Sequence, residues 1–228
     1  QDGTIWRWSE GKNGTSGANL PNYTWPSSPI QLGTDADWYQ LSGNSSTMLA
    51  VKTDGTLWSW GLNTSGQLGL NFAFASPPSQ NQRSSPCQVG SDTNWDTGIP
   101  GGQSETNFAV KTDGTLWVWG SASGLNVNPA PQRSSPTQIP GTTWTSAGAC
   151  SGNGSARFIK SDGTLWTWGH NSRGQLGLND VIYRSSPTQV PGTTWKSNYA
   201  TGVNGDGASA LGIKTDGTLW SWGYNRYG

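Results

Sequence analysis

The chain has 228 residues, a formal net charge of zero and only 11% charged residues. Hydrophobic residues make up 32% of it, while 33 glycines and 13 prolines leave little room for helices. This composition argues against nucleic-acid binding as the main task, because no basic stripe exists to neutralise phosphates. No apolar run approaches the roughly eighteen residues of a membrane helix, so we expect no membrane insertion. The length predicts a single domain of moderate size over 1–228.

One stretch recurs five times. Asp-Gly-Thr, an apolar residue and Trp-x-Trp occur at 2–8, 54–60, 113–119, 162–168 and 216–222. An Asp-Gly pair between apolar runs is typical of a two-residue hairpin turn, since both residues tolerate positive φ. Each copy therefore predicts a β-hairpin. Side chains alternate along a strand, so both tryptophans share one face and the residue between them, such as Val118, is expected on the other, exposed face.

Tryptophan supplies the expected core. Fourteen of the 15 tryptophans fall in repeated slots, namely the hairpin pairs and a third slot at Trp38, Trp95, Trp144 and Trp195. A single hairpin is marginally stable in water, so each unit must stack on its neighbour to bury these rings. We expect layers of indoles between stacked units.

Each period has a further strand and a connector. Ser-Ser-Pro begins the elements at 27–32, 84–89, 134–139 and 185–190, and proline favours an edge strand because it cannot donate to the ladder. Between the Trp-x-Trp strand and this element, Gly-x-Asn-x-x-Gly-Gln-Leu-Gly occurs at 61–69 and 169–177, and a remnant at 120–126. The glycines and leucines predict an ordered connector with its leucines turned inward.

A period near fifty residues with four short strands is typical of a propeller blade. We therefore expect an all-β repeat protein of four-stranded propeller blades, about four repeats, with partial terminal blades. The expected boundaries are a partial blade at 1–32, blades at about 33–90, 91–139 and 140–190, and a partial blade at 191–228. Both ends carry a Trp-x-Trp strand, so we expect a longer array or an assembly in which neighbouring copies complete each other's blades.

In the repeated motifs Asp-Gly-Thr-Leu-Trp-x-Trp-Gly and Gly-x-Asn-x-x-Gly-Gln-Leu-Gly, the sequence resembles tandem repeats of the regulator of chromosome condensation family. The resemblance covers nearly the whole chain. It implies a β-propeller. Members of the family include a nucleotide exchange factor, a secreted inhibitor of β-lactamase, and repeat arrays in bacterial and bacteriophage proteins. The family's Gly-x-x-His after the inner strand has no counterpart at 42–47 or 148–156.

The sequence offers little for catalysis. The only histidine, His170, takes a slot that Leu62, Ser121 and Tyr224 fill elsewhere, and a general base needs a positioned partner. Segment 92–98 resembles a calcium loop, but its glycine is one place late and no glutamate follows. We therefore expect no catalytic residue, no metal site and no cofactor.

Other polar slots favour structural roles. Four lysines precede the Asp-Gly turn, at Lys52, Lys111, Lys160 and Lys214, and repeated charges of this kind indicate solvated strand ends and loop ties rather than ligand contacts. Cys87 and Cys150 lie in different repeats and leave the redox compartment open.

The surface loops carry the functional hypothesis. Tyr23, Trp25, Phe72 and Phe74 are apolar residues in loops, so they either cap the core edge or form a partner-binding patch. We expect a non-catalytic structural or adhesion scaffold that binds a protein partner or further copies of itself. Low Lys and Glu with abundant Asn, Ser, Thr and Gly favours an extracellular or virion surface. The alternative is a protein-binding propeller that acts as an enzyme inhibitor or a guanine nucleotide exchange factor.

Overall fold

The computed structural model describes residues 2–8, 14–18, 26–44, 46–72, 81–96, 105–121, 132–150, 154–196, 201–203 and 209–224. Every helix or strand in these ranges is a β-strand, which confirms the all-β prediction. The described ranges contain no helix long and apolar enough to cross a membrane.

The strands form separate antiparallel sheets that follow chain order. One four-stranded sheet is β3 (Trp38–Gly43), β4 (Thr47–Lys52), β5 (Leu57–Leu62) and β6 (Gln82–Gln88). The same order recurs in β10 (Trp144–Cys150), β11 (Ser155–Lys160), β12 (Leu165–Gly169) and β13 (Arg184–Gln189). This is the order of strands expected for a propeller blade.

The remaining sheets have fewer strands. They are β7 (Thr106–Val110), β8 (Leu116–Gly120) and β9 (Arg133–Ile139); β14 (Thr201–Val203), β15 (Ser209–Ile213) and β16 (Leu219–Gly223); and β1 (Trp6–Arg7) with β2 (Ile30–Gln31). Trp95 and Trp195 each make an isolated bridge to the lysine before the turn, where the four-stranded sheets start an inner strand. We refer to the sheets as the blades over 33–90, 91–139, 140–190 and 191–224.

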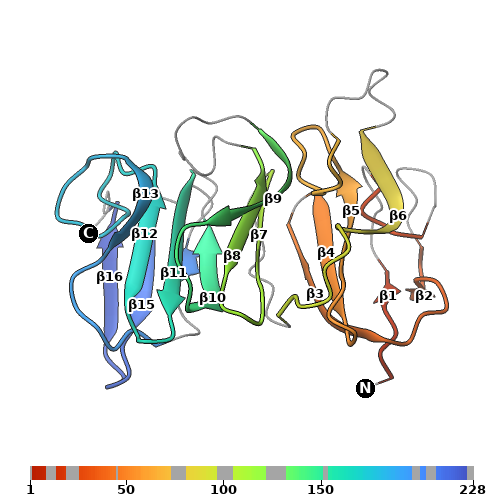
Figure 1. The fold of residues 1–228 in the computed structure, drawn as a ribbon, viewed down its shortest axis with the longest axis horizontal. Helices are drawn as coiled ribbons and strands as arrows, with labels where there is room; N and C mark the ends of the chain where they lie inside the picture. Colours follow the sequence, from red (N-terminus) through yellow and green to blue (C-terminus); the bar gives the residue numbers. More distant parts are fainter. Residues whose placement is uncertain are drawn as a thin grey trace.

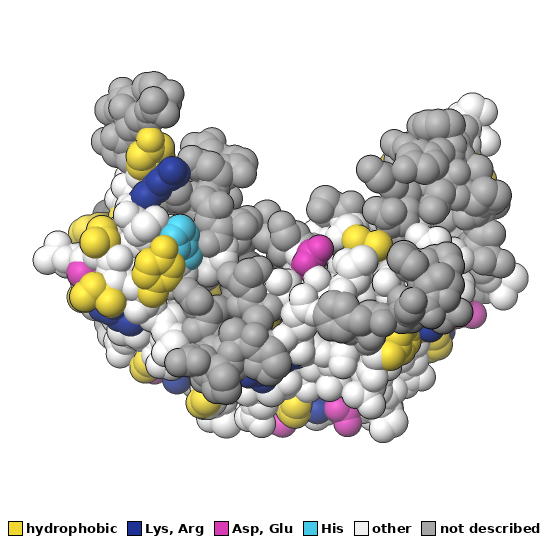
Figure 2. Space-filling model, turned by 90° about the horizontal axis from the view of Figure 1, so that it is seen from above, with side chains coloured by type: hydrophobic (Ala, Val, Ile, Leu, Met, Phe, Trp, Pro, Cys, Tyr) yellow, Lys and Arg dark blue, Asp and Glu magenta, His cyan; other side chains and the backbone are white. Residues whose placement is uncertain are grey.

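The sheets stand side by side in sequence order (Figure 1). The Asp-Gly turns lie at one end of the strands, at the bottom of Figure 1, and the connectors that leave β5 and β12 lie at the other end. We call these ends the turn face and the connector face. Viewed onto the connector face, the array curves around a hollow (Figure 2).

The Ser-Ser-Pro strands are edge strands, as predicted. β6, β9 and β13 each pair on one side only. The register between β5 and β6 shifts between the pairs of Cys87 and Arg83, and Pro86 lies within that shift. Proline has no N–H to give to a regular ladder, so an irregular edge accommodates it.

The Asp-Gly turn differs from the two-residue turn that was expected. Gly55 N donates to Lys52 O at 3.0 Å and Lys52 N donates to Thr56 O at 3.0 Å, so the loop has three residues, 53–55. Gly55 has φ of +77°, whereas Asp54 does not have positive φ. This is a turn closed by a glycine in the left-handed region, a common three-residue hairpin loop.

The aspartate shapes the turn through its side chain. Asp54 Oδ1 accepts hydrogen bonds from Thr56 N at 2.9 Å and Thr56 Oγ1 at 2.7 Å, and Trp58 Nε1 donates to that hydroxyl at 2.8 Å. The same relay from Asp to Thr to Trp is present in the other four turns. The Asp-Gly-Thr-x-Trp motif is therefore a hydrogen-bonded unit.

Both faces of the inner hairpins are buried, and this corrects the expectation that Val118 is exposed. Val118 and Trp119 are both fully buried, whereas Trp117 keeps part of its surface. Trp119 packs with the preceding blade, and Val118 belongs to a buried cluster that includes Trp144 of the following blade. The alternation along the strand was predicted correctly, but a blade in the middle of an array has a neighbour on each side.

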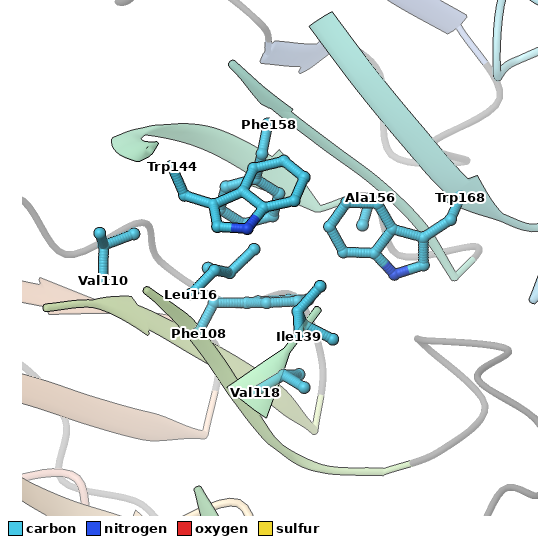
Figure 3. Close-up of a cluster of buried hydrophobic side chains, with 9 residues drawn as sticks. All are labelled: Phe108, Val110, Leu116, Val118, Ile139, Trp144, Ala156, Phe158 and Trp168. Carbon is cyan, nitrogen blue, oxygen red and sulfur yellow. The ribbon is translucent and has the colours of Figure 1, made fainter. Parts of the chain in front are cut away.

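The packing between the blades over 91–139 and 140–190 is aromatic. Phe108 and Phe158 have ring centroids 5.2 Å apart, and Phe158 stacks on Trp168 at 5.5 Å with an interplanar angle of 20°. Figure 3 shows these side chains pointing toward one another from the two sheets. We call this contact the aromatic seam.

The lysines before the turn are less solvated than expected. Each Nζ lies over two indole rings of its own blade. Lys52 and Lys111 are only 9% exposed, so the expectation of solvated strand ends is wrong for these two, whereas their ion pairs with Asp35 and Asp92 are the expected loop ties. The apolar stem is covered while the ammonium gains a cation–π contact.

Candidate interaction surface on the connector face

The connector is held by its own buried polar side chains. In the connector over 61–72, Asn63 Oδ1 accepts from Leu68 N at 2.9 Å and Asn63 Nδ2 donates to Phe72 O at 2.7 Å. Gln67 Oε1 accepts from Ser65 N at 2.7 Å. Asn63, Gln67 and Leu68 are fully buried, so the ordered connector with an inward leucine is confirmed.

The connector also fastens its blade to the next one. Gln67 O accepts hydrogen bonds from Trp119 Nε1 at 2.9 Å and Asn107 Nδ2 at 2.6 Å. Gln175 O accepts from Trp222 Nε1 at 3.0 Å in the equivalent place. We call the contact between the blades over 33–90 and 91–139 the latched seam.

After the second connector the chain forms a tightly bonded loop over 178–184. Asn171 Nδ2 donates to Asp180 O at 3.0 Å and Ile182 O at 3.1 Å, and Asp180 Oδ1 accepts from Ile182 N at 2.9 Å. Arg184 donates to Ile182 O at 2.9 Å and forms an ion pair with Asp180. The Ile182 N–H, and after it the Arg184 guanidinium, lower the pKa of Asp180, so this carboxylate stays ionised at neutral pH.

This loop points three large apolar side chains outward. Val181 is 60% exposed, Ile182 62% and Tyr183 50%. The ring of His170 lies 4.7 Å from that of Tyr183, and Figure 2 shows the histidine among exposed hydrophobic side chains on the connector face. We call Val181, Ile182 and Tyr183 the apolar tip. Contiguous exposed apolar side chains within a polar surface are typical of interaction sites.

Of the four predicted partner-binding residues, only Phe72 lies within the described part of the chain. Phe72 is half-buried, and the guanidinium of Arg83 lies 4.4 Å from its ring centroid. Tyr23, Trp25 and Phe74 lie outside the described residues. Phe72 and Asp180 occupy equivalent connector positions, and in both blades the arginine before Ser-Ser-Pro holds that residue, once by its ring and once by its carboxylate.

The apolar tip was not among the sites predicted from the sequence. The sequence does contain a pattern that could have identified it, because Val181, Ile182 and Tyr183 are three consecutive large apolar residues between a polar connector and a polar edge strand. The alternation rules used for strands do not select such a triplet in a loop.

The structure gives His170 a packing role. Its Nδ1 lies 3.3 Å from Gln175 Nε2, and its ring lies against Tyr183. In the calcium-like segment, the Asp92 carboxylate is bound by Lys111 Nζ at 2.7 Å. The described part of the chain brings together no group of three His, Cys, Asp or Glu side chains that could hold a metal. Cys87 is a free, half-exposed thiol, and the side chain of Cys150 lies outside the described set.

Comparisons with known proteins agree with this architecture. The family model described as regulator of chromosome condensation (RCC1) repeat matches residues 54–97 and 162–204, and a second model of the same description matches 38–67. The ultraviolet-B receptor UVR8 of Arabidopsis thaliana is 25% identical over 229 residues, covering 98% of this chain and 50% of that protein. The chain thus spans about half the length of this curated relative.

Solved structures show the same fold. Human WBSCR16 superposes with a TM-score of 0.77 at 19% identity, covering 99% of this chain and 58% of that one. Yeast RCC1 (Prp20) in complex with Kap60 gives 0.73 at 16% identity, with 96% and 52% covered. The repeated motifs, the sheet order and these matches agree, and together they support an array of propeller blades of the regulator of chromosome condensation repeat type.

Proposed function

We propose that this chain is a non-catalytic protein-binding scaffold that presents the apolar tip to a protein partner. The observation that carries the proposal is the pairing of high exposure with a fixed backbone. Ile182 is 62% exposed, yet its N–H and its carbonyl are both engaged, by Asp180 and by Asn171 and Arg184.

A fixed loop binds with less loss of conformational entropy than a mobile one. Pre-organised groups need little ordering on association, so more of the contact energy appears as affinity. Tyrosine is enriched among residues that dominate interface energetics, and Tyr183 has its ring already positioned by His170. The apolar tip therefore has the features of a docking element.

The related structures support protein binding as a class of function. Yeast Prp20 is bound to Kap60 in one structure, and another concerns its binding to Gsp1p and histones. Among protein-binding roles we favour a structural or adhesion scaffold, since the connectors over 61–72 and 169–180 use the same internal hydrogen bonds. From composition we also propose an extracellular or virion surface location. An enzyme inhibitor or exchange factor is the alternative.

A comparative pulldown tests the proposal. The chain is immobilised and exposed to extract from its native source, alongside Ile182→Asp and a control, Tyr39→Asp, which replaces a residue that is 59% exposed on the inner strand β3. We expect a discrete set of proteins that Ile182→Asp loses and Tyr39→Asp retains. Identical sets from wild type and Ile182→Asp, with both variants folded, would reject the apolar tip as the binding element.

A further inference from the structure

On the turn face, the four equivalent lysines occupy one position but have different partners. Lys52 Nζ lies 4.7 Å and 4.9 Å from the ring centroids of Trp38 and Trp58. Lys160 Nζ lies 4.7 Å and 4.4 Å from those of Trp144 and Trp166. The indole pair therefore places the ammonium in the same way in both blades.

The carboxylate partners are where the blades differ. Lys52 Nζ lies 2.7 Å from Asp35 Oδ2 and 3.1 Å from Asp37 Oδ1, and Lys111 Nζ lies 2.7 Å from Asp92 Oδ2. Among the residues whose positions are described, no carboxylate lies within ion-pair distance of Lys160 or Lys214. Both of these lysines are also more exposed than Lys52 and Lys111.

The blades differ in carboxylate partners because they differ in the loop that precedes the third tryptophan position of each repeat. Trp38 and Trp95 follow the glutamine of the edge strand by seven residues, and their loops contain aspartate. Trp144 and Trp195 follow it by six, through Pro-Gly-Thr-Thr, which has no acidic residue. A Cβ added to Gly141 would lie 3.5 Å from Lys160 Nζ, so a backbone without a side chain borders the ammonium.

The short loop is fixed in place rather than free to fold over the lysine. Trp144 N donates to Gly114 O at 2.9 Å, and Ser161 N donates to Thr143 O at 2.8 Å. These bonds tie the loop to the turns of the preceding blade and of its own blade. Lys160 thus has three N–H donors and a position set by two rings, neither of which offers a lone pair.

We infer that Lys160 and Lys214 bind carboxylate side chains from an acidic segment of a partner protein. We call the position of each ammonium over its two indoles the lysine slot, which is filled at Lys52 and Lys111 and open at Lys160 and Lys214. At the filled slots, each lysine makes a charge-assisted hydrogen bond of 2.7 Å to a carboxylate. Two such open slots lie on one face in consecutive blades, so a segment with two carboxylates gains avidity over a free carboxylate. The inference rests on the proposed protein-binding function but uses the opposite face from the apolar tip.

The aspartate of the turn does not fill the open slot. Asp162 Oδ1 accepts from Thr164 N at 2.9 Å and Thr164 Oγ1 at 2.6 Å. The equivalent aspartates make the same bonds in every turn, including those of the blades where Lys52 and Lys111 bind a further carboxylate. The turn aspartate is therefore common to open and filled slots.

The test uses a fluorescently labelled peptide of alternating glutamate and glycine, with its glutamine counterpart as control, at constant ionic strength. We expect saturable binding of the glutamate peptide, and about tenfold weaker binding to Lys160→Met or Lys214→Met, as for loss of one charge-assisted bond. Lys52→Met and Lys111→Met are matched controls that should bind as wild type does. Equal weakening by all four substitutions, or no saturable binding, would overturn the inference.

A loop exchange provides a second test that keeps the lysine. Replacing residues 140–143 by the sequence of 90–94 brings in the loop that carries Asp92, and it should close the Lys160 slot and weaken peptide binding as much as Lys160→Met does. Unchanged peptide binding to this variant would contradict the inference. Acetate that competes as strongly as the peptide, mole for mole, would reject a partner segment as the source. Ile182→Asp should leave peptide binding unchanged, so the two faces are tested separately.

Discussion

The blades over 33–90 and 140–190 share strand order, turn and connector, but they fill the lysine slot differently. Asp35 and Asp37 bind Lys52, whereas the shorter loop over 140–143 brings no carboxylate to Lys160. Both lysines nevertheless lie over their two indoles at similar distances. The indole pair therefore positions the lysine, and the carboxylate is a separate component that the chain supplies in one blade and omits in the other.

The seams between blades show a second difference of this kind. At the latched seam, Trp119 Nε1 donates to Gln67 O. At the aromatic seam, the equivalent Trp168 Nε1 is buried without a hydrogen-bond partner among the described residues, and Trp168 stacks on Phe158 instead. The preceding blade has only a remnant of the connector motif, at 120–126. Packing of rings thus takes the place of a hydrogen bond.

The largest effect is expected at the aromatic seam. Phe158→Ala removes a fully buried ring that contacts Phe108 and Trp168, and it should destabilise the chain by about 3 to 5 kcal/mol in urea unfolding. Tyr183→Ala, at an exposed ring, is the control and should cost far less. Similar losses for the two variants would show that the aromatic seam does not hold these blades together.

The latched seam should be less sensitive to one substitution. Asn107→Ala removes the 2.6 Å bond to Gln67 O and introduces the residue that the aromatic seam already has at the equivalent Ala156. Because Trp119 still donates to that carbonyl, we expect a loss of about 1 to 3 kcal/mol by the same measurement. A loss as large as that of Phe158→Ala would contradict the distinction between the seams.

The lysine slots should contribute little to stability. Burial of Lys52 opposes its charged form, but the hydrogen bond to Asp35 and the ion pair with Asp37 outweigh this and raise its pKa above the usual 10.5. Its contribution is therefore present below about pH 10.5 and is lost as the pH rises through the higher folded value. Since both aspartates are about half exposed, Lys52→Met should cost at most about 1 kcal/mol more than Lys160→Met at pH 7. A much larger difference in unfolding midpoint would mean that the filled slot is a structural necessity.

The smallest effect concerns the turns, which both blades share. The Thr hydroxyl and then the backbone N–H lower the pKa of Asp54 and Asp162 below 3.8. Because the folded values are depressed, this stabilisation is present above about pH 3.8 and is lost as the pH falls through the folded values. Asp54→Asn and Asp162→Asn should each reduce the acid sensitivity of the unfolding midpoint by a similar, small amount. A loss confined to one of the two would show that the turns are not equivalent.

Much of this architecture could be predicted from residue patterns. The repeats predicted the order of the strands and the edge position of the strand that contains proline, because alternation and turn residues are local signals. The prediction that Val118 is exposed was wrong, because burial of the second strand face depends on a neighbouring blade, which the sequence of one hairpin does not reveal. The partners of Lys52 also escaped prediction, since they come from a loop 15 or more residues earlier in the chain. The apolar tip was missed because loop hydrogen bonds decide which way Val181, Ile182 and Tyr183 point.

Within the described part of the chain, the ammonium groups of Lys160 and Lys214 have no carboxylate partner, whereas those of Lys52 and Lys111 bind the chain's own carboxylates. Competitive acetylation of the intact chain, followed by mass spectrometry of each lysine, measures this directly. We expect faster modification of Lys160 and Lys214 than of Lys52 and Lys111, and protection of only the first two by the glutamate peptide. Equal rates at all four lysines, or protection of all four, would contradict this expectation.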